Sequence, residues 1–544
     1  MLAPLLTLLS ACALGLPSFA TQSTDPSGLG RQDVGRPIGE THRNLRLARE
    51  VLRRSLAAYG SMAGRLSVAE LDISFTGTLS YQGHYRRPGE GREFELRNRY
   101  RASEYWDAVS STTRISSRTG KSVNAQVLVA GDQVFETEAG MRVGSQLHGR
   151  EALAVRSALR AFLPHQLLER IDQNADGLRH LGRVELRERP HALLSYTDLD
   201  GRSITILIDA ETWLMTRVEY LRHMPGRGDC VDFIEYEEHK VIGGIQIPHR
   251  RHSVEFDKEA RTEQYLRVAG VSYGRRALRS DFYLPKDRIP GDRPEELAAQ
   301  WASALQVPGD RAAPSLVVHE LGGGLWMMAL HEQDCKVVVA TFKDYSVVLE
   351  APGDSESGTQ IIEAVAKRTP NQPVRYLVLS HHHSHASAGL RPFVEAGVTL
   401  VTTPGNVEYF KRLANWSYAI EPDGQEVMRE QVDFRIVEGR DTFEDDTQEL
   451  LLVDIGGLSG QTDEYLVCWL PRQGVLCEGD LALELGLPEL GPASKSVRAL
   501  HAMIRGLKFD VQSIVQARPL VRRALVTSMS ELDGLVQTRE ASSR

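Results

Sequence analysis

Histidines are concentrated in one short loop of this chain. His381, His382, His383 and His385 directly follow an apolar run at 376–379, which we predict to be a strand. Imidazoles two residues apart on a loop that leaves the end of a strand can point the same way and share one divalent cation. The spacing therefore predicts a metal site. The alternative is a polar surface loop that happens to be rich in histidine.

The residues around this loop resemble the metallo-β-lactamase-fold superfamily, whose corresponding loop reads His-x-His-x-Asp-His before a Gly-rich helix start. In that register this chain has His381, His383 and His385, and a glycine follows shortly afterwards at Gly389. The resemblance continues through a predicted helix and strand, through later apolar segments and to Asp480. It spans roughly residues 315 to 530 and implies an αββα sandwich.

The resemblance implies a ligand set. Two histidines, His381 and His383, and one carboxylate, Asp480, match metal-binding positions of the family. Two imidazoles and one carboxylate hold a single zinc, or a ferrous iron in a facial triad, and leave open positions. We therefore predict one divalent metal in this chain, with zinc favoured over iron.

The remaining functional positions depart from the family pattern. His385 and Ala386 stand where the family has the aspartate and histidine of its second metal site. Gln461 stands where it has the histidine before Thr-Asp, and its last histidine position falls near Ala517. These departures indicate that a two-metal site is absent.

A single cation is sufficient for one class of reactions. It lowers the pKa of bound water and polarises a carbonyl, which suits hydrolysis of an ester, a lactone or an amide. His385 replaces the usual carboxylate base and is our candidate catalytic residue, because its pKa is near neutral; it could instead be a fourth ligand. We predict a metal-dependent hydrolase of a small molecule. The alternatives are a non-catalytic binding protein of the same fold and a mononuclear iron oxygenase.

The elements that would position these residues are indicated by hydrophobic periodicity. Strands are predicted at 337–340, 346–350 and 374–379, with a helix at 360–367. This strand, helix, strand order fits one half of an αββα sandwich.

The N-terminal half has a different pattern. A helix is predicted from Thr41, its N-cap, to Tyr59, and a second one at 156–171. Alternating apolar residues such as Leu71, Ile73 and Phe75 make residues 65–285 an antiparallel sheet. This part weakly resembles the outer-membrane lipoprotein carrier type of curved sheet, which implies a half-barrel able to take an acyl chain. The alternative is a scaffold for the hydrolase-like part.

Length and composition give the wider organisation. The chain has 544 residues and 42% hydrophobic content, which predicts two or three domains. We predict an α+β protein with a β-rich domain at 41–285, a proline-containing linker at 286–314 and a metallo-β-lactamase-like domain at 315–530. The net charge of -8 and the lack of a basic block exclude nucleic acid as an expected partner.

The N-terminal residues and the cysteines indicate the cellular compartment in which the protein is expected. Residues 1–20 are apolar and small, as in a secretory signal, so we expect a periplasmic or secreted protein. Cys12 also fits a lipobox, which would anchor the chain at a membrane instead. Cys468 and Cys477 are predicted to lie opposite each other on two strands, either bridged or as buried free thiols.

Overall fold

The computed structural model describes most of the chain. It covers residues 39–274 and 316–540, apart from short stretches at 84, 105–106, 118–121, 132, 139–144, 149–151, 153–154, 157, 160, 198–202, 225, 257–259, 425–431, 482–492 and 521–524. The predicted signal segment with Cys12 and the predicted linker at 286–314 lie outside these residues. Within the described part, no helix has the length and apolar character needed to cross a membrane. The chain is a mixed α+β protein with large sheets.

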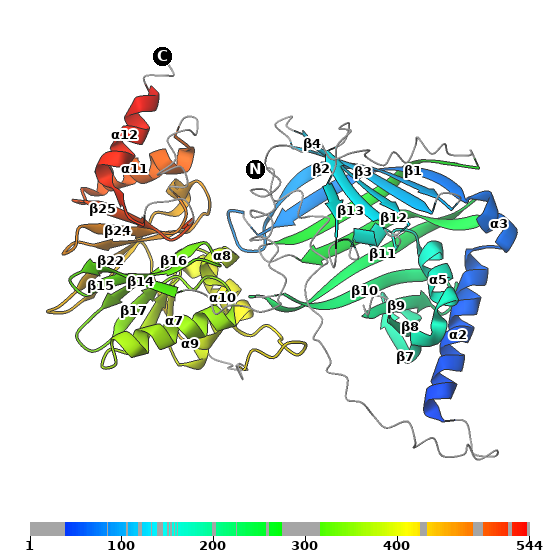
Figure 1. Ribbon diagram of the computed structural model, residues 1–544, viewed down its shortest axis with the longest axis horizontal. Helices are drawn as coiled ribbons and strands as arrows, with labels where there is room; N and C mark the ends of the chain where they lie inside the picture. Colours follow the sequence, from blue (N-terminus) through cyan, green and yellow to red (C-terminus); the bar gives the residue numbers. More distant parts are fainter. Residues whose placement is uncertain are drawn as a thin grey trace.

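The first sheet has 13 strands in the order β6-β5-β4-β3-β2-β1-β13-β12-β11-β10-β9-β8-β7, and all neighbours are antiparallel (Figure 1). A twisted open sheet of this width normally curls, and this one bends between its β1–β4 and β7–β10 portions. The strands are β1 (Glu70–Gln82), β2 (Gly91–Ser103), β3 (Ala108–Ser116), β4 (Ser122–Ala130), β5 (Gln133–Glu138), β6 (Ser145–Leu147), β7 (Leu178–Leu186), β8 (Arg189–Thr197), β9 (Ser203–Asp209), β10 (Met215–Met224), β11 (Gly228–Ile242), β12 (Ile245–Phe256) and β13 (Arg261–Tyr273).

One face of this sheet is apolar and covered by helices. Leu71, Ile73 and Phe75 of β1 are buried, as their alternation predicts, whereas Ser74 between them is exposed. Helices α2 (Glu40–Tyr59) and α5 (Pro164–Gln173) pack together with apolar residues of β7–β11 in one core cluster. Helices α2 and α5 therefore cover this part of the apolar face, where a half-barrel would take an acyl chain. The resemblance to the lipoprotein carrier stays a prediction.

Two helix boundaries differ from the sequence-based expectation. The first helix starts at Glu40 with Gly39 as N-cap, so Thr41 lies inside its first turn. The second, predicted at 156–171, is interrupted: residues 155–156 and 158–159 are helical, residues 161–163 are not, and α5 begins at Pro164, because proline fits the first helical position, where no N–H is needed. The short helix α3 (Met62–Ser67) follows the first one.

The C-terminal part contains two further sheets. The seven-stranded sheet has the order β14-β15-β16-β17-β18-β19-β20, antiparallel up to β17 and parallel from there on. Its strands are β14 (Leu316–Gly322), β15 (Leu325–Leu330), β16 (Cys335–Thr341), β17 (Ser346–Leu349), β18 (Val374–Val378), β19 (Thr399–Thr402) and β20 (Phe434–Ile436). The six-stranded sheet, β21 to β26 in sequence order, comprises β21 (Arg440–Glu444), β22 (Glu449–Asp454), β23 (Leu466–Leu470), β24 (Val475–Glu478), β25 (Ser513–Gln516) and β26 (Thr527–Ser528).

These two sheets pack face to face, with helices on both outer sides (Figure 1). A core cluster of residues from both sheets, among them Val338, Leu452 and Val515, fills the space between them. A second cluster joins the seven-stranded sheet to α7 (Ser355–Arg368), α9 (Arg391–Glu395) and α10 (Val407–Ala414). A third joins the six-stranded sheet to α11 (Lys495–Leu507) and α12 (Met529–Glu540). The strands and the helix predicted between 337 and 379 are present as β16, β17, α7 and β18.

The cysteine pair lies in the six-stranded sheet. Cys468 of β23 is opposite Cys477 of β24, as predicted, and both are buried free thiols. The predicted domain boundaries stay predictions, although β1–β13 all lie between 41 and 285, and β14–β26 between 315 and 530.

Candidate metal centre

The histidine loop, residues 380–386, leaves the carboxyl end of β18 in the parallel part of its sheet. The Leu379 N–H donates to the Val401 carbonyl at 3.0 Å, which extends the pairing with β19 by one residue. Beyond it the chain turns, and a short helix, α8 (Ser384–Ser387), begins after His383. Carboxyl ends of parallel strands are where α/β sheets place ligands, so the local fold positions this loop as a site.

Four side chains converge at this position. His381, His383, His385 and Asp480 each offer one ligand atom, and these atoms all lie within 4.8 Å of one another. His381 Nε2 is 3.8 Å from Asp480 Oδ1, and His385 Nε2 is 3.4 Å from Asp480 Oδ2. Imidazole nitrogens and a carboxylate oxygen are the donors that zinc and other first-row metals prefer. The residues thus fit a divalent cation, and we call them the metal cluster.

The fourth histidine of the loop is not part of this cluster. The His382 ring packs against Tyr409, with ring centroids 5.8 Å apart and an edge-on geometry. The His382 ring also lies edge-on to the His383 ring, with centroids 4.9 Å apart, but its nitrogens are not among the four converging ligand atoms.

Asp480 reaches the cluster from the six-stranded sheet, two residues after the end of β24. The Tyr465 hydroxyl donates to Asp480 Oδ1 at 3.2 Å and accepts from the Asp480 N–H at 2.9 Å. The Tyr465 ring also stacks on His381, with centroids 4.7 Å apart. A Cβ at Gly479 would lie 2.4 Å from the Tyr465 hydroxyl, so glycine at this position permits the close approach.

The charge of Asp480 is set by its neighbours. Burial by itself would raise the pKa of this carboxyl, but the hydrogen bond from His385 and the charges of His381 and His383 outweigh it. The net effect holds the pKa of Asp480 well below its usual range. Asp480 is therefore an ionised carboxylate near neutral pH.

A buried acid, Glu350, is linked to the metal cluster through Ser380. The Ser380 hydroxyl lies 2.7 Å from His381 Nδ1, and Ser380 also hydrogen-bonds Glu350. Burial, only partly offset by these hydrogen bonds, raises the pKa of Glu350 to about 8. Partners of this kind orient a metal-ligating imidazole and set its tautomer.

Glu350 and Tyr465 were both missed by the sequence analysis. Glu350 follows the buried strand β17, and an acid after an apolar strand is a weak signal that could have drawn attention to it. Tyr465 has no local signal, because its role depends on contacts with His381 and Asp480.

The positions that depart from the family pattern lie beside the cluster. The Gln461 side-chain amide donates to the Asp480 carbonyl at 3.0 Å. Ala517 and Ala386 line a small cavity of about 10 Å³ together with Cys335, Glu350 and His385. This cavity has room for about one water molecule.

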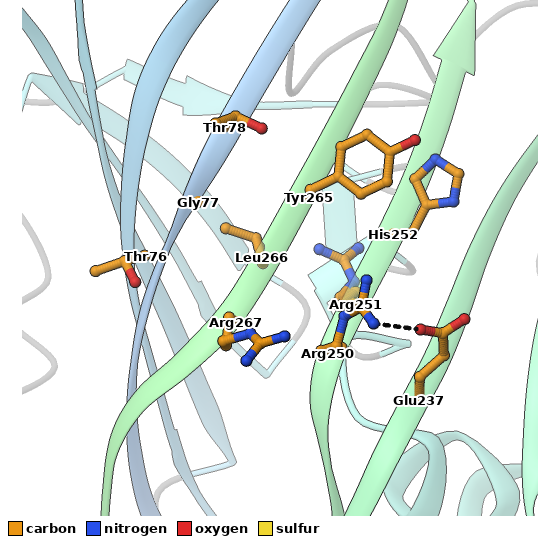
Figure 2. A pocket seen from close by; sticks show the side chains of 10 residues that line it. All are labelled: Thr76, Gly77, Thr78, Glu237, Arg250, Arg251, His252, Tyr265, Leu266 and Arg267. Carbon is orange, nitrogen blue, oxygen red and sulfur yellow. Dashed lines mark ion pairs between the residues drawn. The ribbon is translucent and has the colours of Figure 1, made fainter.

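A second hollow, of about 240 Å³, lies on the 13-stranded sheet (Figure 2). Its lining carries three arginines and one glutamate, and two of the arginines are paired with acids. Arg250 Nη1 is 3.5 Å from carboxylate oxygens of both Glu237 and Glu238, and Arg267 Nη2 is 3.4 Å from Glu238. The metal cluster is thus the more specific candidate site. The lining residues of the hollow are Thr76, Gly77, Thr78, Glu237, Arg250, Arg251, His252, Tyr265, Leu266 and Arg267.

No protein-family model matches the chain, and no curated protein matches its sequence. Solved structures with similarity include the metallo-β-lactamase FIM-1 from Pseudomonas aeruginosa in its mono-zinc form, at 17% identity and a TM-score of 0.31, covering 42% of this chain and 96% of that one. The metallo-β-lactamase DIM-1 has 14% identity and a TM-score of 0.31, with 42% and 99% covered. A metallo-β-lactamase from Erythrobacter litoralis has 17% identity and a TM-score of 0.31, with 43% and 99% covered.

Proposed function

We propose that this protein is a metal-dependent hydrolase of a small molecule, an ester, a lactone or an amide. Its one divalent cation, zinc in preference to iron, would be held by His381, His383 and Asp480. The observation that carries the proposal is the convergence of these residues with His385 within 4.8 Å. Lewis-acid polarisation of a carbonyl and a lowered pKa of water are the chemistry that a divalent cation supplies when bound.

His385 is assigned to proton transfer for a geometric reason. Catalytic zinc sites use three protein ligands and leave a position open, whereas structural sites are closed by a fourth. The two oxygens of Asp480 are divided between neighbours: Oδ1 lies toward His381 and Oδ2 lies 3.4 Å from His385 Nε2. One carboxylate can thus ligate through one oxygen and orient the His385 imidazole through the other, which is the arrangement a general base needs.

A second candidate function is favoured by the burial of the cluster. The His381 side chain is fully buried, and those of His385 and Asp480 are 9% and 11% exposed. If His385 is a fourth ligand, the site is closed and the protein binds rather than converts its small molecule. A mononuclear iron oxygenase would use the same two histidines and carboxylate with iron.

The test is metal content measured together with hydrolysis of chromogenic ester, lactone and amide substrates. We expect about one equivalent of zinc in the wild-type protein and background metal in His381→Ala/His383→Ala. His382→Gln is the matched control, since it changes a histidine of the same loop whose nitrogens are not among the converging ligand atoms, and it should keep the metal.

His385→Gln separates the two candidates. Loss of hydrolysis with zinc retained supports the general base, whereas loss of zinc supports a closed four-ligand site. Absence of bound metal from the wild-type protein would refute the hydrolase and the closed metal site, and would favour a non-catalytic binding protein whose metal site is lost. About one equivalent of iron with no hydrolysis would favour the oxygenase.

We also propose export of this protein through a signal at residues 1–20, with anchoring at Cys12 as the alternative. The composition of this segment supports the proposal. Mass spectrometry of the mature N-terminus tests it: a chain starting near Thr21 supports soluble export, an acylated Cys12 supports anchoring, and an intact Met1 contradicts both.

A further inference from the structure

Two hairpins of the 13-stranded sheet contact the part of the chain that bears the metal cluster (Figure 1). The first hairpin joins β1 to β2 and carries Arg86 and Arg87 near its tip, and the second joins β10 to β11. The first contact consists of ion pairs and a hydrogen bond, and the second consists of hydrogen bonds and close packing.

The first hairpin places two guanidinium groups on one carboxylate. Arg86 Nε lies 2.6 Å from Asp463 Oδ1, and Arg87 Nε lies 2.8 Å from Asp463 Oδ2. The Asp463 N–H also donates to the Arg86 carbonyl at 2.8 Å. Both oxygens of Asp463 and its main chain are thus fixed by the hairpin, a geometry that arginine supports better than lysine.

Asp463 lies midway between two residues that support the metal cluster. Gln461, two positions before it, donates its side-chain amide to the Asp480 carbonyl at 3.0 Å. Tyr465, two positions after it, stacks on His381 and exchanges two hydrogen bonds with Asp480. A shift of Asp463 would therefore be transmitted to the carboxylate ligand from both sides.

The second hairpin holds the sheet in place from another direction. Asp229, at its base, accepts from the Ser417 hydroxyl at 2.8 Å and from the Ala419 N–H at 2.6 Å, and its carbonyl accepts from Trp416 Nε1 at 2.8 Å. At the tip, a Cβ on Gly226 would lie 2.6 Å from the Ala388 Cβ. The tip therefore packs against the segment that directly follows the histidine loop.

We propose that Arg86 and Arg87 are positioning residues of the metal centre, supplied by the 13-stranded sheet. They hold Asp463, and through Gln461 and Tyr465 they keep the Asp480 carboxylate in ligating position. The N-terminal part is then a component of the site and not only a neighbour. This inference rests on the proposed metal-binding function.

The chain contains a matched control for this arrangement. Arg99 and Arg101 also place two guanidinium groups on one carboxylate, Asp72, at 2.5 and 3.3 Å, but all three belong to the 13-stranded sheet. The variants Arg86→Ala/Arg87→Ala and Arg99→Ala/Arg101→Ala each remove two positive charges and both ion pairs to the shared carboxylate. The first variant also removes the 3.8 Å ion pair between Arg87 and Glu90. Only the first pair contacts the metal-bearing part.

The first measurement is the Zn²⁺ dissociation constant of the full chain, by competition with a chromogenic chelator. Changes of outer partners weaken metal sites about 10–100-fold, so we expect a loss of about tenfold in Arg86→Ala/Arg87→Ala. Arg99→Ala/Arg101→Ala should bind as the wild type does. Asp463→Asn should repeat the loss and Asp463→Glu should restore most of the affinity. Equal affinity in both double variants would overturn the inference.

The second measurement is hydrogen exchange of residues 456–481, made without added metal. We expect faster exchange in Arg86→Ala/Arg87→Ala than in the control, because the loop loses its anchor. This readout separates the two proposals. If the wild type binds no Zn²⁺ while exchange still increases, the metal function fails and the positioning of this loop stands; unchanged exchange removes the positioning role whatever the metal does.

Discussion

Two of the regions in which histidines meet carboxylates combine them in opposite proportions. On the 13-stranded sheet, His252 lies between two acids, with Nδ1 3.0 Å from Glu235 and Nε2 2.7 Å from Glu263. In the metal cluster, three histidines of one loop surround the single carboxylate of Asp480. The first arrangement is satisfied when both ring nitrogens of His252 carry a proton and each donates to one acid, whereas the second gathers three imidazoles and one carboxylate, a donor set that suits a metal.

The pKa directions reflect this difference. Burial by itself would lower the pKa of His252, but its hydrogen bonds to Glu235 and Glu263 raise it above the ordinary value. His252 is thus poised to be an imidazolium in a charge network that is complete in itself. Imidazoles ligate a metal in their neutral form, so three of them around an ionised carboxylate form a site that a divalent cation would complete. The proportion of imidazoles to acids distinguishes a structural network from a ligand set.

The largest expected effect comes from removing the one acid of the cluster. Asp480→Asn should weaken Zn²⁺ binding by more than about 100-fold, because even outer partners cost 10–100-fold. Zn²⁺ titration against a competing chelator measures it. The control is Glu263→Gln, which removes one of the two acids around His252 and should leave Zn²⁺ affinity unchanged. If both variants lost the same affinity, the proposed difference between the metal cluster and the His252 network would be wrong.

Metal binding should also stabilise one region and not the other. At a free Zn²⁺ concentration of about 100 times the dissociation constant, the free energy of unfolding should rise by about 2.7 kcal/mol. Urea denaturation with and without Zn²⁺ measures this rise, and hydrogen exchange locates it at residues 380–386. His252→Gln should show the same increase. If Zn²⁺ instead slowed hydrogen exchange on β12, which carries His252, the cation would bind on the 13-stranded sheet and the prediction would be wrong.

The smallest expected effect is the pH dependence that His252 contributes. Its raised folded-state pKa means that its stabilisation is fully present below the unfolded value of about 6.5 and is lost as pH rises through the folded value. Burial favours a higher pKa for Glu235, but its bonds to His252 and Arg187 lower it, so its stabilisation is present above about 4.3 and lost as pH falls through its folded value. The network therefore stabilises most between these limits.

Denaturation of His252→Gln across pH 5 to 9 tests this window. The variant should be less stable than the wild type by about 0.2–1 kcal/mol at the acidic end, the range of a partly exposed ion pair, and the gap should close on the alkaline side. His42→Gln, on the exposed side of α2, should show no such gap. A difference that grows with rising pH would have the wrong sign.

Much of the fold was predictable from local patterns. The alternation of Leu71, Ile73 and Phe75 predicted β1, and the register of Cys468 opposite Cys477 followed from counting outward from a short turn. The helix predicted at 156–171 is interrupted: residues 155–156 and 158–159 are helical, residues 161–163 are not, and a new helix begins at Pro164, where proline suits the first helical position. Periodicity thus identifies elements, and backbone chemistry decides where they begin.

The histidine loop and the strand before it were determined by the sequence alone, because the spacing of His381, His383 and His385 and the apolar run before them are local properties of the chain. Asp480 was suggested only through a family resemblance. The contributions of Tyr465, Glu350 and Arg86 were decided by the tertiary structure. Each acts through contacts with residues far away in sequence, and such contacts depend on how two sheets and a hairpin pack, which no local spacing encodes.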